Sequence, residues 1–412
     1  MAAPSARASV LIDNIGMLAS PAGDRAPLRG PELGAVAMTR DAAVAIVDGR
    51  IEAAGQRDVV RAAHGGLEVV DAGGRAAIPG LIDCHTHAAF GGDRAGEFEL
   101  RASGAGYEEI HAAGGGIASS VRATREAAAR GTLGMVLERH LGWMAAQGTT
   151  TAEVKSGYGL DRDTELAMLE AASLPHRIET VPTFLGAHAV APEWDDADAY
   201  IDFVIEDVLP AAAPAAEAAD VFLERGAFDR AQADRYLQAA ARHGLALRLH
   251  ADQFSEGGGV ELAVRLGARS VDHLEATGER GVAALCDSEV AAVLLPACVL
   301  MLDLPRPPAR GLIDGGATVC LATDFNPGSA FCDSLPLVMS LACMQLGMTP
   351  GEALGACTVN AAWVLGRSER LGRIAPGYDG DVVLLDADDW RHASYHLGGR
   401  VAAATYKRGV HL

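Results

Sequence analysis

His85 and His87 are the first residues in the chain whose types and spacing suggest chemistry. They stand one residue apart at the end of an apolar run that begins at Pro79. If this run is a β-strand, its two-residue period puts both imidazoles on one face, where they can converge on a metal ion. On its own the pair is a weak signal, because the chain contains 13 histidines. A metal site therefore requires further ligands elsewhere in the chain.

Three later apolar segments also end in residue types that bind metals. They are His250 after 245–249, His273 after 270–272 and Asp324 after 319–323. If these segments are strands of one parallel barrel, their carboxyl ends meet on the same face. Imidazoles and a carboxylate suit Zn²⁺ or Fe²⁺ and leave a coordination position for water. We predict one divalent metal held by His85, His87, His250 and Asp324.

The elements that would position these ligands can be read from the same pattern. Eight segments have the length and apolar character of buried strands, and they end near His87, Lys155, His188, Glu224, His250, His273, Pro296 and Asp324. Eight is the number that a (β/α)₈ barrel, an α/β fold, requires. Helices are predicted at 161–172, 195–209, 229–243, 260–266, 278–287, 334–346 and 350–363, and the alanine-rich segment 211–219 is interpreted as a helix end and loop.

Both ends of the chain have a different, strand-rich pattern. Residues 43–53 read as two alternating strands joined at Asp48-Gly49, a pair suited to a tight hairpin turn. Residues 381–386 read as a buried strand, and 400–412 can form another hairpin. Because chain termini often lie close together, we predict one small β-sandwich-like domain from 1–78 plus 368–412, and a barrel domain from 79–367.

Composition limits the classes of partner. The net charge of -20 disfavours nucleic acids and anionic membranes, although a local arginine can still hold a small anionic substrate. The seven cysteines are scattered without a Cys-x-x-Cys, so neither a disulfide framework nor a thiolate zinc site is indicated. No apolar run approaches the ~20 residues that span a bilayer, and the N-terminus lacks a signal-peptide pattern. We therefore expect a cytoplasmic protein.

The whole pattern of ligands and flanking β segments resembles the amidohydrolase superfamily. More narrowly, the segments 90–94, 153–159, 184–188 and 324–329 resemble those of the imidazolonepropionase family. The resemblance implies one zinc or iron ion and hydrolysis of 4-imidazolone-5-propanoate to N-formimidoyl-L-glutamate, the third step of histidine degradation. It also makes a homodimer plausible. By resemblance, the residues that contact substrate or product are Tyr158, His188, Asn326, Gly328 and Ser329.

The residue types suit hydrolysis of a cyclic amide. A bound metal lowers the pKa of its water and polarises a carbonyl, and Asp324 can accept the water's proton. His273 is assigned to orienting or polarising, with a further metal ligand or a hydrogen-bonded strand end as alternatives. The propionate of the substrate requires a cation, and Arg94 fits because a guanidinium binds a carboxylate with two parallel hydrogen bonds.

Lys155 and Gln253 distinguish the predicted single-metal hydrolase from other enzymes of the superfamily. Lys155 closes the second strand, whereas the lysine that bridges two metals in hydantoinase- or dihydroorotase-type enzymes closes the fourth, which here ends in Glu224. Gln253 stands where some members of the family and the related deaminases have a glutamate, and an amide can hydrogen-bond the ring but cannot shuttle protons. A deaminase of nucleobase-like rings is therefore the less favoured enzyme. A non-catalytic barrel subunit predicts eroded ligands, and none of the proposed ligands is missing.

Overall fold

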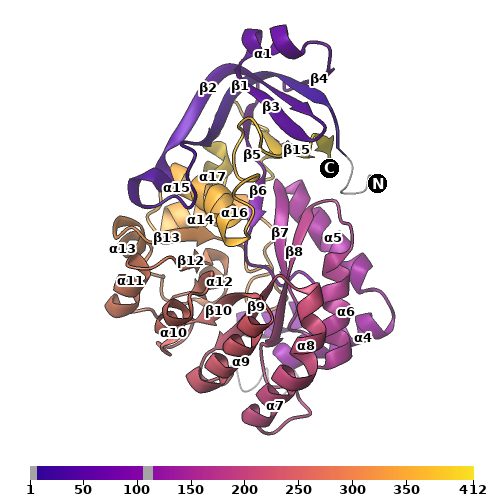
Figure 1. Cartoon of the computed structure of the whole chain (residues 1–412), viewed down its shortest axis with the longest axis vertical. Helices are drawn as coiled ribbons and strands as arrows, with labels where there is room; N and C mark the ends of the chain where they lie inside the picture. Colours follow the sequence, from indigo (N-terminus) through magenta and orange to yellow (C-terminus); the bar gives the residue numbers. More distant parts are fainter. Residues whose placement is uncertain (1–6, 105–114) are drawn as a thin grey trace.

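The computed structural model of the protein describes residues 7–104 and 115–412. The first six residues of the predicted N-terminal β segment lie outside this range. Two β-sheets organise the chain (Figure 1), one formed by strands from the two ends of the chain and one formed by the middle. We call them the terminal sheet, β1–β5 with β14–β16, and the barrel sheet, β6–β13.

The barrel sheet contains eight parallel strands in chain order, which confirms the predicted (β/α)₈ pattern. Its strands are β6 (Leu81–Asp83), β7 (Thr149–Lys155), β8 (Glu179–Ala187), β9 (Ala218–Leu223), β10 (Ala246–Ala251), β11 (Ser270–His273), β12 (Ala291–Leu294) and β13 (Thr318–Leu321). They are covered on their outer side by helices and filled on their inner side by side chains. Both faces are therefore buried, which is why these strands have continuous apolar runs rather than alternation.

The barrel closes between β13 and β6 by contacts beyond the ends of both strands. Thr86 pairs with Phe325 in a parallel bridge, the Asp324 amide donates to the His85 carbonyl (3.1 Å) and the His87 amide donates to the Phe325 carbonyl (3.0 Å). The expectation that His85 and His87 end the first strand is corrected accordingly. They lie in an extended segment after β6, and the closing bonds hold that segment against the last strand.

Helices follow the barrel strands and cover the barrel (Figure 1). They are α2 (Ala95–Ala102), α4 (Ile117–Ala129), α5 (Leu133–Ala146), α6 (Arg162–Ser173), α7 (Ala197–Phe203), α8 (Leu209–Ala212), α9 (Arg230–Arg242), α10 (Gly259–Leu266), α11 (Glu279–Cys286), α12 (Pro296–Leu302), α13 (Ala309–Asp314), α14 (Leu335–Gln345), α15 (Pro350–Gly355) and α16 (Ala361–Val364). The helices predicted at 195–209 and 350–363 are each interrupted by a π-helical turn, at Val204–Val208 and Ala356–Asn360. β12 ends at Leu294, near the predicted position, and Pro296 is the first residue of α12.

Local signals in the sequence explain where several helices begin. Asp229 and Thr349 each accept from the third backbone amide of the following helix, while Gln232 and Glu352 reach back to complete capping boxes. Each box satisfies amides that have no partner within the helix. α9 and α15 consequently start at the predicted positions.

The terminal sheet joins the two ends of the chain. Its remaining strands are β1 (Val10–Pro21), β2 (Val36–Val47), β3 (Arg50–Gln56), β4 (Glu68–Asp71), β5 (Ala76–Pro79), β14 (Val382–Leu385), β15 (Ala402–Lys407) and β16 (Val410–His411), with α1 (Arg57–His64) and α17 (His392–Tyr395) beside them. The predicted hairpin turn at Asp48-Gly49 joins β2 to β3, and both residues have positive φ angles. β5 pairs with β14, so strands from opposite ends of the chain are neighbours.

Gly80 separates the terminal sheet from the barrel sheet. β5 ends at Pro79 in one sheet, and β6 begins at Leu81 in the other. A Cβ at Gly80 would lie 2.3 Å from the Thr150 Oγ1 atom, so only glycine fits this crossing. Among the described residues, no helix is long and apolar enough to cross a membrane.

Candidate metal centre and active site

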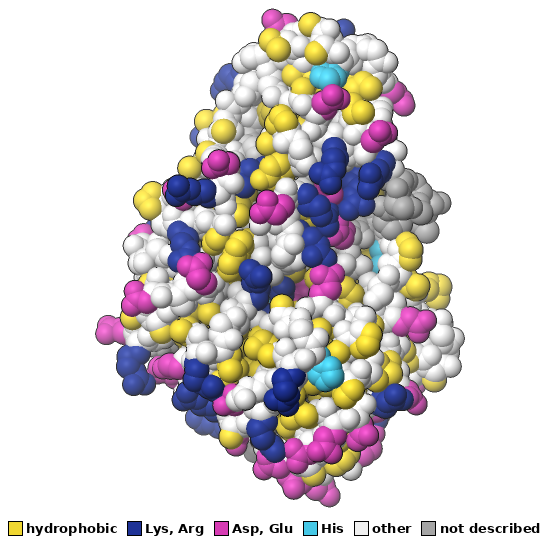
Figure 2. Space-filling view, in the orientation of Figure 1, with side chains coloured by type: hydrophobic (Ala, Val, Ile, Leu, Met, Phe, Trp, Pro, Cys, Tyr) yellow, Lys and Arg dark blue, Asp and Glu magenta, His cyan; other side chains and the backbone are white. Residues whose placement is uncertain are grey.

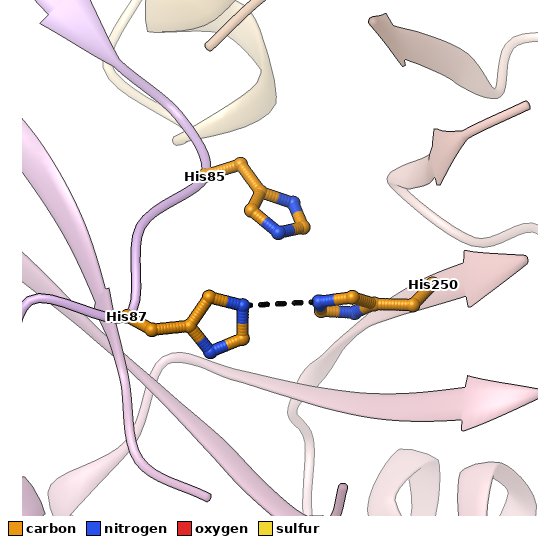
Figure 3. A group of neighbouring side chains, drawn as sticks. All are labelled: His85, His87 and His250. Carbon is orange, nitrogen blue, oxygen red and sulfur yellow. Dashed lines mark hydrogen bonds between the residues drawn. The ribbon is translucent and has the colours of Figure 1, made fainter. Parts of the chain in front are cut away.

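The four predicted metal donors converge at the carboxyl ends of the barrel strands. His85 and His87 come from the segment after β6, His250 from β10, and Asp324 from the loop after β13. Figure 3 shows the three imidazoles facing one another across a small gap. One ring nitrogen from each histidine lies within 4.8 Å of the others. All four side chains are buried.

The arrangement of these donors fits a metal ion. Within the described part of the chain, the buried His85 Nε2 atom has no hydrogen-bond partner. His87 Nε2 and His250 Nε2 lie 3.2 Å apart, so their lone pairs oppose each other unless a proton or a cation lies between them. Asp324 Oδ1 is 3.5 Å from the Nε2 atoms of His85 and His87. A cation among these atoms would give the three Nε2 atoms and the Asp324 carboxylate a common partner.

Burial keeps His85 and His87 in their ligating, neutral form, whereas it opposes the ionised form of Asp324. Burial lowers the pKa of His85 and of His87 well below the usual value, so both imidazoles are neutral at pH 7. Burial raises the pKa of Asp324. Neutral imidazoles with a carboxylate form the donor set that zinc and iron(II) sites use.

Two carboxylates stand behind the histidines. Asp272 Oδ2 lies 2.6 Å from His85 Nδ1, and Asp220 Oδ2 lies 3.0 Å from His250 Nδ1. The Asp272 hydrogen bond fixes the His85 ring, and Asp220 faces His250 Nδ1 at ion-pair distance without a hydrogen bond among the described residues, so that each Nε2 is presented to the other donors. Sequence reasoning missed both aspartates. The available signal was a charged residue placed inside a strand that is otherwise apolar.

The residues relevant to a second metal are turned to other partners. Lys155 Nζ lies 2.7 Å from Asp220 Oδ2 and 2.8 Å from Glu153 Oε2, in the closed interior of the barrel. Glu224, directly after the fourth strand, accepts from the amides of Phe254 (2.8 Å) and Ser255 (3.2 Å). Neither side chain is free to bridge two metals in this arrangement.

His273 lies beside the metal donors. One of its ring nitrogens is within 4.8 Å of donor atoms of His85 and Asp324, and its backbone has a positive φ of 85°. Its Nδ1 atom lies 3.4 Å from Glu275 Oε1. Burial alone would lower the pKa of His273, but the Glu275 carboxylate and the Cys298 thiol raise it well above the usual value. Glu275 is a further residue that sequence reasoning missed.

The predicted substrate-binding residues line one cavity of about 460 Å³ that opens onto the metal donors. Its walls include Arg94, Tyr158, His188, Gln253, His273, Asn326, Gly328 and Ser329 together with His87, His250 and Asp324. His85 is fully buried beneath this surface. Gln253 donates from Nε2 to the Cys298 sulfur at 3.3 Å, which fixes its amide at the cavity wall.

The loop after β13 is braced by Asn326. Its Oδ1 accepts from the amides of Gly328 and Ser329, both at 2.8 Å, and its Nδ2 donates to the Asp324 carbonyl at 2.6 Å. Ser329 Oγ donates to Asp324 Oδ2 at 3.3 Å, while Asp324 Oδ1 faces the histidines. In this structure Asn326 and Ser329 therefore position the loop and the Asp324 carboxylate.

Arg94 lies against the same loop. Its Nε donates to Ser120 Oγ at 2.9 Å, and a Cβ at Gly328 would lie only 2.3 Å from one terminal guanidinium nitrogen. Gly328 thus leaves room for the guanidinium itself. Arg101, a second cationic residue in the cavity wall that sequence reasoning missed, donates to the Gly328 carbonyl at 3.1 Å.

His188 and Tyr158 form an aromatic wall next to the metal donors. The His188 ring stacks on His87 with centroids 5.0 Å apart, and Tyr158 meets His188 edge-on at 5.2 Å. His188 Nδ1 lies 2.9 Å from the Gly157 carbonyl, and burial lowers the pKa of His188 to about 3. Burial raises the pKa of Tyr158, so both groups are neutral at pH 7. A flat heterocycle can stack here and hydrogen-bond at its edge.

Comparison with known proteins agrees with this geometry. A profile of the amidohydrolase family matches residues 76–409. Imidazolonepropionase of Rubrobacter xylanophilus is 58% identical over 407 residues, covering 97% of this chain and 98% of the relative. That of Chloroflexus aggregans is 48% identical and covers 97% of each chain. Among solved structures, E. coli guanine deaminase has the same fold, with a TM-score of 0.71, 15% identity and 99% coverage of both chains. The chain belongs to the imidazolonepropionase family of amidohydrolases.

Proposed function

We propose that the protein hydrolyses 4-imidazolone-5-propanoate to N-formimidoyl-L-glutamate. One observation carries the proposal. A single cavity presents metal donors on one side and the Arg94 guanidinium in its wall, which matches a ring amide with a carboxylate tail. The identity to imidazolonepropionases along nearly the whole chain supports the same substrate.

The reaction adds water across the ring amide. A zinc or iron(II) ion held by His85, His87, His250 and Asp324 would lower the pKa of its water and polarise the ring carbonyl. The Asp324 carboxylate accepts a proton as the new carbon–oxygen bond forms. It returns that proton to the ring nitrogen as the carbon–nitrogen bond breaks. His273, held beside Glu275, is placed to stabilise the negative charge that develops on the carbonyl oxygen.

The cavity walls orient the substrate for this step. Tyr158 and His188 offer neutral aromatic surfaces for the ring, and Gln253 offers an amide for hydrogen bonding. Arg94 binds the propionate, which needs a local cation because the protein as a whole is acidic. Holding both ends of the substrate places the amide carbon at the metal side of the cavity.

Deamination of a nucleobase-like ring is the competing activity. E. coli guanine deaminase shares this fold at only 15% identity, so the similarity concerns the fold and not the substrate. A deaminase of that kind needs a carboxylic acid that both gives and takes protons at the ring, and Gln253 cannot do either. Gln253 therefore favours hydrolysis of the ring amide over deamination.

The test combines metal analysis with a choice of substrates. The purified protein is analysed for metal per chain, then supplied with freshly generated imidazolonepropionate and, separately, with cytosine, guanine and hydantoin. We expect one zinc or iron per chain and turnover of imidazolonepropionate alone. Turnover of cytosine or guanine alone would overturn the proposal.

Several finer points remain predictions. Zinc and iron(II) both suit the donor set, and metal analysis will distinguish them. A homodimer, a cytoplasmic location and a division into domains at residues 79 and 368 are expected from the sequence and its resemblance. Light scattering and limited proteolysis address the first and last of these directly.

A further inference from the structure

We propose that Lys155 is a positioning residue for the metal centre, acting as the shared cation of the two carboxylates that hold His85 and His250. The inference rests on the metal centre of the proposed function, but not on its substrate. Lys155 touches none of the metal donors in the contacts of the described residues. It acts through Asp220 and Asp272.

The contacts form a chain from the lysine to both histidines. Lys155 Nζ lies 2.7 Å from Asp220 Oδ2 and 3.9 Å from Asp272 Oδ2. The same Asp220 oxygen lies 3.0 Å from His250 Nδ1, and the same Asp272 oxygen lies 2.6 Å from His85 Nδ1. Each carboxylate oxygen therefore faces the ammonium group and one imidazole at once.

The position of Lys155 in the barrel makes this sharing possible. Lys155 is on β7, Asp220 on β9 and Asp272 on β11, so the three side chains meet across the barrel interior rather than along one strand. All three are fully buried. In such a dry interior a carboxylate without a cation is strongly unfavourable, and its orientation is set by whatever partner remains.

A third carboxylate and a second cation complete the cluster. Glu153 Oε2 lies 2.8 Å from Lys155 Nζ, and Glu153 Oε1 lies 3.0 Å from the Arg248 guanidinium. Arg248 also donates to the Cys84 carbonyl at 2.9 Å, directly before His85. The cluster thus fixes the backbone that carries one ligand as well as the side-chain partners of two. Its cations keep their charge, because the surrounding carboxylates outweigh burial and raise the pKa of Lys155 and of Arg248.

Positioning and simple electrostatics predict opposite effects of removing Lys155. Removing a cation near a metal site would, by charge alone, strengthen metal binding. Loss of the partner that orients Asp220 and Asp272 would weaken it, since such supporting contacts are typically worth 10- to 100-fold in metal affinity. A lower metal affinity of the Lys155→Met variant would therefore show that Lys155 positions the partners of the metal donors.

The experiment measures metal binding without substrate. Apoprotein of the wild type and of Lys155→Met is titrated with Co²⁺ in competition with a chromophoric chelator, and the visible Co²⁺ spectrum is recorded. We expect Co²⁺ affinity to fall by about tenfold or more and the bands to shift, and Lys155→Arg to recover part of both effects. Turnover of imidazolonepropionate is measured separately, so an error in the substrate assignment leaves this result unaffected.

Lys407 provides a matched control. It is also buried and lies 2.7 Å from Asp381 Oδ2 and 3.2 Å from Thr151 on β7, but its contacts with the described residues include no partner of the metal donors. We expect Lys407→Met to lower stability while leaving Co²⁺ affinity and spectrum unchanged. If Lys155→Met does not fold, Lys155→Gln tests the same link, because it also removes the cation from Asp220 and Asp272. Unchanged or tighter Co²⁺ binding in the folded Lys155→Met, or in Lys155→Gln when it stands in, would overturn the proposal.

Discussion

Arg94 lies in the cavity wall with its guanidinium against the backbone of Gly328. If it binds the propionate, Arg94→Ala should raise KM by about 10- to 100-fold, the value of a charge-assisted hydrogen-bonded pair. Metal content should not change, because Arg94 belongs to the loop after β6 and not to the donor set. Steady-state kinetics with metal analysis of the same preparation checks both expectations.

Arg94→Lys sharpens this test. A lysine keeps the charge but loses the planar fork that matches a carboxylate, so its KM should fall between the wild-type and alanine values. A loss of metal in either variant would mean that Arg94 has a structural role instead.

Gly328 controls the position of Arg94. In Gly328→Ala the new Cβ would meet the far end of the Arg94 side chain at 2.3 Å, and that side chain can move away at little cost in folding free energy. We therefore expect a higher KM with a nearly unchanged unfolding midpoint. The effect on KM should be smaller in an Arg94→Ala background, because the two residues act as one unit.

Gly96→Ala is the matched control for this substitution. Gly96 lies on α2 near Arg94, and no atom of residues 7–104 or 115–412 stands within 4 Å of a Cβ built there. Its KM should equal that of the wild type. Equal increases in KM for the Gly328 and Gly96 variants would contradict the steric argument.

The metal donors could be predicted from the sequence, whereas their supporting residues could not. His85, His87, His250 and Asp324 share a recognisable feature, since each follows an apolar strand-like run. The pairing of His85 with Asp272 joins residues 187 positions apart, and it depends on the register of strands that are not neighbours in the chain. That register is decided by the closed barrel as a whole.

Among the elements, buried strands were easier to predict than the helices between them. Strands buried on both faces have uninterrupted apolar runs, which is why β7–β13 lie near their predicted ends. α4 and α5 were not predicted. In the described structure no side chain at the start of α4 or α5 caps the first backbone amides of the helix. Neither helix start therefore has the capping residue that would have predicted it from the sequence. The π-helical turns at Val204–Val208 and Ala356–Asn360 were not predicted either.

The crossing at Gly80 offers a prediction at this scale. Gly80→Ala would place a Cβ 2.3 Å from Thr150 Oγ1 and 2.6 Å from Thr150 Cγ2, in a region where both sheets are packed. Overpacking of this kind typically costs about 1–3 kcal/mol, so the free energy of unfolding should fall by that amount. Urea unfolding followed by circular dichroism measures it.

Thr150→Ala removes both clashing atoms and should recover part of the loss in the double variant. Gly66→Ala serves as the control, because no atom in the described part of the chain lies within 4 Å of a Cβ at that loop position. An unfolding midpoint for Gly80→Ala equal to that of Gly66→Ala would show that the crossing tolerates a side chain.

At the scale of the whole molecule, Glu179 ties the barrel to the C-terminal strands. It begins β8 and meets Arg367 (3.2 Å), Lys407 (3.4 Å) and Arg408 (3.4 Å), as well as Arg370 at close range. Figure 2 shows basic side chains gathered at the level where the terminal sheet meets the barrel. One carboxylate thus balances cations from the chain leaving the barrel and from the end of β15, which pairs with β14 and β16 in the terminal sheet.

This junction predicts a specific dependence of stability on pH. Burial opposes the charge of Glu179, but Lys407 and the arginines outweigh it and lower the pKa of Glu179 to about 2 from the usual 4.5. A carboxyl group whose pKa is lower in the folded state stabilises the protein above its unfolded pKa, and that contribution is lost as the pH falls toward the folded pKa. Glu179→Gln should therefore lower the free energy of unfolding at pH 7 by about 1–3 kcal/mol, after allowance for partial solvent screening. The difference from the wild type should shrink between pH 4.5 and pH 2.

Glu217→Gln removes a more exposed partner of Arg367 and should cost less than about 1 kcal/mol at any pH. A deficit in Glu179→Gln that stays constant down to pH 2 would mean that the glutamine disturbs packing rather than removing a charge.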